Sequence, residues 1–140
     1  MSSSVSTTKP RRALSITLWI VQVLLAGMFL MTGFMKLSQP IAALSGQMPW
    51  VTSVPGALVR FIGAAELAGA LGLILPSLTR IRPRLTVLAA IGLITVMVLA
   101  SAFHISRGEA AMVPMNLVLA ALAAFVAWGR SKAAPIAPRA

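Results

Sequence analysis

Several charged or strongly polar side chains interrupt the apolar stretches of this 140-residue chain. A charge at the centre of a bilayer costs at least roughly 2.5–3.5 kcal/mol, so such residues usually face the interior of a helix bundle and pair with one another. Each of four apolar segments carries one or two of them near the same predicted membrane depth. The candidate ligand-binding residues in this cluster are Lys36, Arg60, Glu66, His104 and Asn116.

Glu66 and His104 are the candidate catalytic residues, because a carboxyl group and an imidazole can exchange protons. Arg60 and Glu66 lie about 120° apart around one helix, so Lys36, on a neighbouring segment, is the better predicted partner for Glu66. Two interpretations of that pair stay open: a salt bridge that fixes the order of the helices, or part of a site that moves protons. His104 could equally be a hydrogen-bonded interface residue, Arg60 could extend to lipid headgroups, and Asn116 could join two helices.

The residues predict no metal or haem site and identify no cofactor. The chain contains one histidine and no cysteine, so neither a His-based metal site nor a Cys-ligated cluster can be assembled. A haem held by His104 and a methionine is conceivable, but the eight methionines are mostly scattered, as is typical of packing residues. The lack of cysteine also excludes disulfides and thiol–disulfide relay chemistry.

The composition is that of an integral membrane protein. Of the residues, 59% are hydrophobic and 10% are charged, and the mean hydropathy is +0.94, whereas a soluble domain is about 25% charged. The net charge of +10 comes from short cation clusters between apolar segments, not from a basic helix face. This pattern excludes a nucleic-acid-binding protein and favours topology signals and contact with anionic lipid headgroups.

The apolar segments predict a single all-α transmembrane domain with four spans over residues 13–128. About 20 apolar residues cross a hydrocarbon core about 30 Å thick. The first segment is too long for a signal-peptide core and is expected to be retained, and Pro76 is expected to end the second. Disordered basic tails are predicted at 1–12 and 129–140. The four spans are about 13–37, 57–75, 85–105 and 112–128.

Lysine and arginine residues set the predicted orientation of the bundle. The N-terminal tail, the turn at 80–84 and the C-terminal tail hold three each, more than either remaining connection. The positive-inside rule then places both termini in the cytoplasm. The prediction is an up-down-up-down four-helix bundle whose polar cluster lies in the outer half of the membrane.

Small residues recur every four positions along the second span. This spacing lets helix backbones approach closely in lipid, although an Ala-rich segment also produces it by chance. The segment is interpreted as a packing face, and an exposed part of it could dock a partner helix. The predicted packing residues are Ala64, Ala65, Ala68, Gly69 and Gly72.

Several short motifs together resemble those of the DoxX-like family of small bacterial membrane proteins. The resemblance extends over about residues 17–128. The motifs are GFMKL at 33–37, RFIGAAELAGALGLILP at 60–76, ASAFH at 100–104 and a last helix led by Pro114.

This resemblance implies a multi-pass protein of the bacterial inner membrane, with the family's characteristic polar residues at Lys36, Glu66 and His104. Some members of the family are named as subunits of quinol- or thiosulfate-oxidising complexes, and others as partners in membrane redox assemblies. A family name alone does not establish an activity, since one fold serves many functions.

Three functional hypotheses follow. The first is a redox-associated membrane subunit that holds a quinone-like molecule in the polar pocket; if it has enzymatic activity, it would be a subunit of an oxidoreductase and not a stand-alone catalyst. The second is a non-catalytic assembly factor or accessory subunit that docks a partner helix. The third is a small-molecule transporter, which would have to form a homodimer because four helices are few for alternating access.

Overall fold

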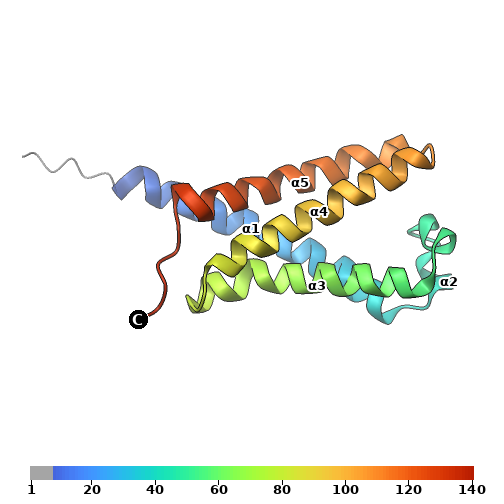
Figure 1. Cartoon of the computed structure of the whole chain (residues 1–140), viewed down its shortest axis with the longest axis horizontal. Coiled ribbons are helices and arrows are strands. Elements are labelled where there is room, and N and C mark those ends of the chain that lie inside the picture. Colours follow the sequence, from blue (N-terminus) through green and yellow to red (C-terminus); the bar gives the residue numbers. More distant parts are fainter. Residues whose placement is uncertain (1–7) are drawn as a thin grey trace, which may run out of the picture.

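The computed structural model of the protein describes residues 8–140 and is all-helical over that range. Four long helices run antiparallel to their neighbours and form a bundle (Figure 1). Each coincides with or overlaps a segment long and apolar enough to cross a membrane. The predicted all-α, four-helix membrane fold is therefore confirmed. The long helices are α1 (Thr8–Ser38), α3 (Gly56–Thr79), α4 (Arg84–Ser106) and α5 (Val113–Trp128).

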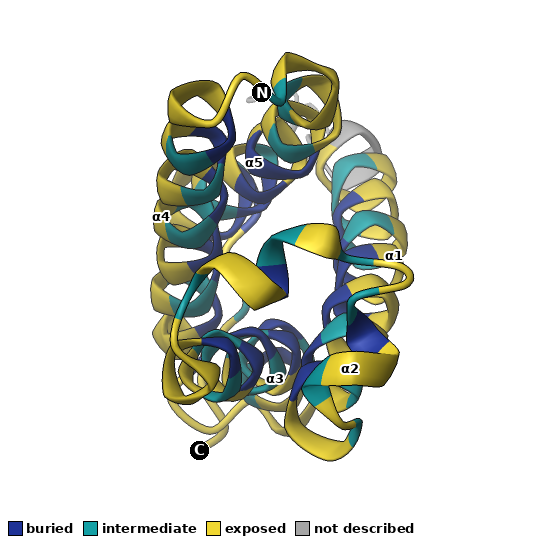
Figure 2. Cartoon of the chain, turned by 90° about the vertical axis from the view of Figure 1, so that its right-hand side faces the viewer, coloured by how far each residue is buried: buried dark blue, intermediate teal, exposed yellow. Residues whose placement is uncertain are grey.

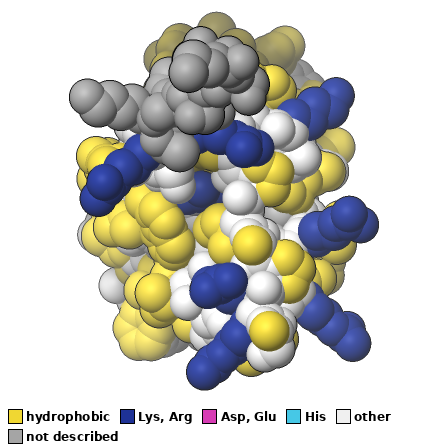
Figure 3. All heavy atoms as spheres, turned by 90° about the vertical axis from the view of Figure 1, so that its left-hand side faces the viewer, with side chains coloured by type: hydrophobic (Ala, Val, Ile, Leu, Met, Phe, Trp, Pro, Cys, Tyr) yellow, Lys and Arg dark blue, Asp and Glu magenta, His cyan; other side chains and the backbone are white. Residues whose placement is uncertain are grey.

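Short helices complete the two ends of the bundle. At the loop end, which carries the α1–α3 and α4–α5 connections, the segment around residues 49–53 lies across the ring of long helices, and α2 lies to one side of it (Figure 2). The terminal end carries the start of α1, the α3–α4 turn and the chain after α5, and lysine and arginine side chains gather on it (Figure 3). The short helices are α2 (Ile41–Leu44), η1 (Pro49–Ser53), η2 (Ala110–Met112) and the π-helical turn η3 (Gly129–Ala133).

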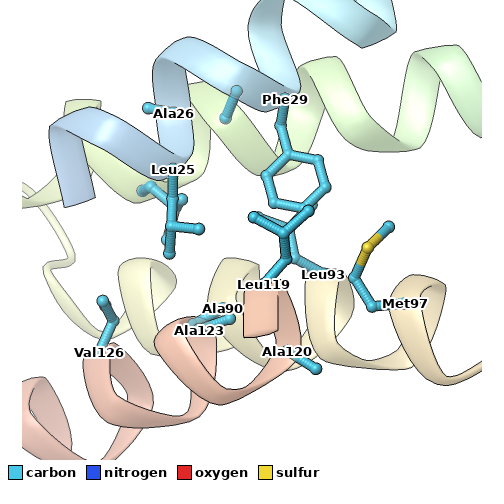
Figure 4. Close-up of a cluster of buried hydrophobic side chains, with 12 residues drawn as sticks. Leu25, Ala26, Phe29, Ala90, Leu93, Met97, Leu119, Ala120, Ala123 and Val126 are labelled. Atoms are coloured by element: carbon cyan, nitrogen blue, oxygen red, sulfur yellow. The ribbon is translucent and has the colours of Figure 1, made fainter. Parts of the chain in front are cut away.

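Buried apolar side chains from all four long helices fill the centre of the bundle. Phe29 of α1 points toward Leu93 of α4, near Leu119 of α5 (Figure 4). On the outside, large apolar side chains such as Phe34 and Leu99 are 62% and 64% exposed. So much exposed apolar surface is abnormal for a soluble monomer. On membrane-spanning helices it contacts acyl chains, so the lipid bilayer is a partner of this protein.

Helices α1 and α3 approach closely because two glycines face each other between them. A Cβ atom added to Gly33 would lie 2.8 Å from the carbonyl oxygen of Gly63 and 2.9 Å from the backbone nitrogen of Leu67. A Cβ atom added to Gly63 would lie 2.8 Å from the Cβ atom of Lys36. The glycine contact therefore brings Lys36 directly against α3.

The substitution Gly33→Ala is expected to lower the free energy of unfolding by about 1–3 kcal/mol, because the added methyl group would meet backbone atoms that cannot rotate away. Unfolding in detergent measures this loss. Gly27→Ala, on the exposed side of the same helix, is the matched control, because no neighbouring atom lies within 4 Å of its added Cβ atom. Equal stability of the two variants would contradict the close contact at Gly33.

The predicted small-residue face of α3 divides into separate parts. Gly69 and Gly72 pack on α4, since a Cβ atom added to either would lie 2.6 Å from a side-chain atom of that helix. Ala64 and Ala68 are exposed, and Ala65 lines the cavity described below. Four-residue spacing identifies positions that share a side of the helix, but it does not say which of them meets a neighbour.

Helix α3 continues past Pro76 to Thr79, whereas the sequence predicted the span to end at residue 75. Proline removes the N–H that would bond the carbonyl group four residues earlier. Inside a membrane bundle, neighbouring helices can supply donors to the backbone near a proline. Here Gln22 of α1 donates from Nε2 to the carbonyl oxygen of Leu73 at 2.6 Å, next to the carbonyl group of Gly72 that loses its helical donor at Pro76.

The structure also differs from the two predicted disordered tails. Helix α1 already begins at Thr8, while residues 1–7 lie outside the described residues. After α5 the chain continues into η3, where Arg130 is only 5% exposed. Gly129 allows this because it packs tightly on α1: a Cβ atom added there would lie 2.5 Å from Cδ2 of Leu18.

Candidate functional site

A buried ion pair between α1 and α3 forms the centre of the candidate site. Nζ of Lys36 lies 2.9 Å from Oε1 and 2.8 Å from Oε2 of Glu66, and the two residues are 6% and 3% exposed. Thr32, one helical turn before Lys36 on α1, donates from Oγ1 to Oε2 of Glu66 at 3.2 Å. The predicted pairing of Glu66 with Lys36 is therefore present, and the carboxylate accepts hydrogen bonds on both oxygens.

Arg60 supports the ion pair from outside it. Its Nη1 donates to the carbonyl oxygen of Lys36, which lies in the last turn of α1, where carbonyl groups lack partners within the helix. Arg60 makes no salt bridge with Glu66 and is not among the residues that line the cavity. The structure therefore separates Arg60 from the predicted ligand-binding residues and assigns it to the end of α1.

His104, at the end of α4, pairs with Glu109 and not with Glu66. Its Nδ1 lies 2.7 Å from Oε2 of Glu109, whose Oε1 accepts a hydrogen bond from Nε of Arg107 at 3.0 Å and forms a salt bridge with Nη2 of Arg107 at 2.9 Å. The chain can turn back over His104 because Gly108 adopts a φ of 73°, a left-handed conformation that glycine adopts without strain. Glu109 was not among the predicted site residues, although its place five residues after the single histidine was a usable signal.

The hydrogen bonds from Arg107 and then from His104 hold the pKa of Glu109 below its ordinary value of 4.5. A carboxyl group with a lowered folded-state pKa stabilises the fold above its unfolded pKa, and this contribution is lost as the pH falls through the folded value. Glu109→Gln is therefore expected to be less stable than the wild type at neutral pH and equally stable well below pH 4.5. Unfolding midpoints measured across this range test the expectation. Parallel profiles for the two proteins would contradict it.

An apolar cavity of about 410 Å³ adjoins the ion pair, and we call it the Glu66 cavity. Its walls come from the end of α1, from α3 and α4, from η2 and the start of α5, and from the segment around η1. On its outer side it reaches Phe61 of α3 and Leu99 of α4, which are 69% and 64% exposed. The cavity thus extends to the lipid-facing surface between α3 and α4. Its polar lining residues are Lys36, Glu66, His104 and Asn116.

Two aromatic rings line the part of the Glu66 cavity nearest the loop end of the bundle. Trp50 of η1 and Phe103 of α4 both line it and make an edge-to-face contact, with ring centroids 6.1 Å apart. Nζ of Lys36 lies 5.9 Å from the centre of the Trp50 ring, within the range of a cation–π interaction. Trp50 therefore contacts residues on two long helices. Trp50 was not among the predicted site residues.

Asn116, which lines the cavity, has a buried side-chain atom without a hydrogen-bond partner in the part of the chain that the structure describes. Its Nδ2 atom is buried and has no hydrogen-bond partner among residues 8–140. A buried donor without an acceptor costs free energy, so such an atom calls for an explanation. If Asn116 joined two helices through Nδ2, this atom would donate a hydrogen bond to a neighbouring helix. Within the described residues it makes no such bond.

The structure thus brings four of the five predicted site residues to one cavity, where Arg60 is the exception. Between Thr8 and Ala140, no group of three or more His, Cys, Asp and Glu side chains is arranged to hold a metal ion. What the cavity offers instead is an ammonium group, a carboxylate, an imidazole and a free amide donor on apolar walls.

Comparison with known proteins gives one match. A family model described as the DoxX-like family matches residues 20–126, a segment that contains all the polar residues of the Glu66 cavity. No curated protein and no solved structure matches the chain. With four helices able to cross a bilayer and a family match over most of its length, this multi-pass membrane protein belongs to the DoxX-like family.

Proposed function

We propose that this protein is a redox-associated membrane subunit that binds a quinone-like molecule in the Glu66 cavity. The observation that carries the proposal is the buried, unpartnered side-chain nitrogen of Asn116 in the wall of an apolar cavity. Ligand sites are typically apolar pockets with a few placed polar groups. A ligand carbonyl oxygen on an apolar ring would supply the acceptor that Asn116 lacks.

Lys36 supplies a second donor for such a ligand. An ammonium group has three N–H donors, and the two oxygens of Glu66 account for two of them. The third is available to a carbonyl oxygen in the cavity that Lys36 lines. The rings of Trp50 and Phe103 add flat apolar surface, which suits the offset or edge contacts that aromatic rings prefer.

The side of the cavity between Phe61 and Leu99 suits a ligand that arrives from the bilayer. Both side chains line the cavity and are largely exposed on the lipid-facing surface. A quinone dissolved among the acyl chains could therefore enter between α3 and α4 without crossing water. An isoprenoid tail could remain in the lipid while the ring occupies the cavity.

His104 and Glu109 form a candidate path for protons between the cavity and water. His104 lines the cavity and is 6% exposed, whereas the Glu109 side chain is 31% exposed. Reduction of a quinone to a quinol takes up two electrons and two protons, and the reverse reaction releases them. The protein's residues would carry only the protons, so the electrons must come from or go to a redox-active partner subunit.

The expected location for this function is the bacterial inner membrane. The excess of lysine and arginine at the terminal end predicts that this end faces the cytoplasm. The Glu66 cavity, at the opposite end of the bundle, would then lie in the outer half of the membrane. A partner subunit would have to reach that half to exchange electrons with the ligand.

Binding of decylubiquinone to the purified protein tests the proposal. We expect saturable quenching of tryptophan fluorescence, which Trp50→Phe should reduce because Trp50 lines the cavity. Asn116→Leu should weaken binding about tenfold, since the loss of one buried hydrogen bond is worth about 1–3 kcal/mol. The same variant should fold at least as stably as the wild type, because it removes an unpaired buried donor.

The control for this experiment is Met115→Leu, on the exposed side of the same helix turn, which should bind as the wild type does. Equal binding by Asn116→Leu and Met115→Leu would reject the assigned donor. No saturable binding at all would reject the quinone site. Capture of a partner by crosslinking, or uptake of solute by reconstituted dimers, would then favour the accessory subunit or the transporter.

A further inference from the structure

A second hollow, of about 990 Å³, lies at the terminal end of the bundle, far from the Glu66 cavity. It is bounded by the α3–α4 turn, the start of α4, η3 and the chain at 135–138. The backbone carbonyl oxygen of Ala137 accepts a hydrogen bond from Nε of Arg80 at 2.9 Å, which holds this last segment against the turn. The arginines that line the hollow are Arg11, Arg82, Arg84 and Arg130.

Arg130 is the unusual member of this group, because it is a buried cation with neutral partners only. It is 5% exposed, and its Nε donates to Oε1 of Gln22 at 2.7 Å. Its Nη1 donates to Oγ of Ser15 at 3.0 Å and to the carbonyl oxygen of Ala134 at 3.2 Å, and its Nη2 donates to the carbonyl oxygen of Ser15 at 3.3 Å. These bonds use four of its five N–H groups. The fifth, on Nη2, has no acceptor in the described part of the chain.

No acidic side chain of this protein is available to neutralise Arg130. The sequence contains two acidic residues, Glu66 and Glu109. Both lie toward the loop end, where Glu66 pairs with Lys36 and Glu109 pairs with Arg107 and His104. Buried charges in proteins are normally paired, because an unpaired charge in a medium of low dielectric constant is costly.

We infer that this hollow binds the phosphate group of an anionic phospholipid. Arginine pairs well with phosphate through charge-assisted hydrogen bonds, and Arg130 keeps one N–H on Nη2 that can donate to a phosphate oxygen. Arg130 would contribute the buried charge at the inner wall, with Arg82 on the α3–α4 turn, Arg84 at the start of α4 and Arg11 on α1 around the opening. Basic pockets between transmembrane helices at the headgroup level are suited to such lipids.

The apolar part of the lining favours a lipid over a free phosphate ion. Leu85 and Leu88 of α4 also line the hollow, and they are 44% and 61% exposed on the surface that faces the bilayer. A phospholipid could place its headgroup among the arginines and lay an acyl chain along these leucines. A free phosphate ion would leave the apolar part of the hollow unused.

This inference does not depend on the proposed quinone site, and it separates a defined site from general attraction to a basic surface. General attraction of an anionic lipid to a basic surface depends on the number of exposed cations. A defined site depends on Arg130, which contributes little to the exposed surface. The comparison of Arg130 with an exposed arginine at the same end of the molecule therefore distinguishes the two.

The test uses native mass spectra and unfolding midpoints of the full chain in a non-ionic detergent, with phosphatidylglycerol, phosphatidylcholine or inorganic phosphate added. We expect one tightly retained phosphatidylglycerol, a raised unfolding midpoint, and little effect of phosphatidylcholine. Arg130→Gln should weaken phosphatidylglycerol binding at least about tenfold. Arg12→Gln, an exposed arginine that removes the same charge without lining the hollow, should leave binding unchanged.

Arg84→Gln provides a second variant in case Arg130→Gln does not fold, because Arg84 lines the hollow but is exposed. It should also weaken retention of phosphatidylglycerol. Equal losses for Arg84→Gln and Arg12→Gln would overturn the site in favour of diffuse surface attraction. Stabilisation by inorganic phosphate that equals that by phosphatidylglycerol would overturn the lipid assignment and identify a free-anion site. Equal retention of phosphatidylcholine would overturn the role of charge.

Discussion

The substitution Glu66→Gln is expected to lower the free energy of unfolding by about 3–5 kcal/mol, the usual cost of removing one partner from a buried ion pair. Lys36 would then be a buried ammonium group without a carboxylate, since it is only 6% exposed. Equilibrium unfolding in mixed micelles measures the loss. Thr32→Val, which removes only the hydrogen bond from Thr32 to the same carboxylate, should cost about 1 kcal/mol and serves as the graded control.

The double variant Lys36→Met with Glu66→Leu should recover most of this loss. Replacing both members of a buried pair with apolar residues of similar size is often neutral or stabilising. A stable double variant that no longer binds decylubiquinone would separate the two interpretations of the pair, because it would show that the charges serve the ligand and not the fold. A double variant that is as unstable as Glu66→Gln would show that the ion pair itself holds α1 against α3.

Filling the Glu66 cavity from α3 is expected to abolish quinone binding without unfolding the protein. Ala65 lines the cavity, so the ring of an Ala65→Phe variant would occupy space that the ligand needs. We expect binding to weaken by on the order of 100-fold or more, because the ligand would lose both its apolar contacts and its access to Asn116. Quenching of tryptophan fluorescence by decylubiquinone measures the effect.

Ala64→Phe is the matched control for this experiment, since it adds the same ring at the adjacent, exposed position of α3. It should bind the quinone as the wild type does, and both variants should unfold at similar detergent concentrations. Wild-type binding by Ala65→Phe would place the ligand elsewhere on the protein. Loss of binding in both variants would point to a general disturbance of α3.

The membrane fold and the central ion pair could be predicted from the sequence for the same physical reason. Four long apolar segments cannot remain in water, and a lysine and a glutamate within them must meet each other, because neither is stable alone among acyl chains. Helical periodicity then favoured Lys36 over Arg60 as the partner of Glu66. These predictions required only burial and angular position around a helix.

Other features depended on details that periodicity does not carry. Pro76 was expected to end a helix, but a glutamine on α1 provides a donor to the backbone beside it. A glycine often marks the end of a helix. Gly129 instead allows a close contact with Leu18 of α1, so the next residue, Arg130, is buried inside the bundle. Both outcomes follow from three-dimensional neighbours that are distant in the sequence. The pairing of His104 with Glu109 likewise required the left-handed turn at Gly108.

The division of the ion pair between two separate helices bears on how the protein is made. During synthesis α1 is made before α3. Until α3 is present, the side chain of Lys36, near the C-terminal end of α1, can extend to the lipid headgroups. Glu66 lies near the middle of α3 and has no such route to the surface. Helix α3 should therefore be released into the bilayer only together with α1, as a preassembled hairpin in which each charge already has its counterpart.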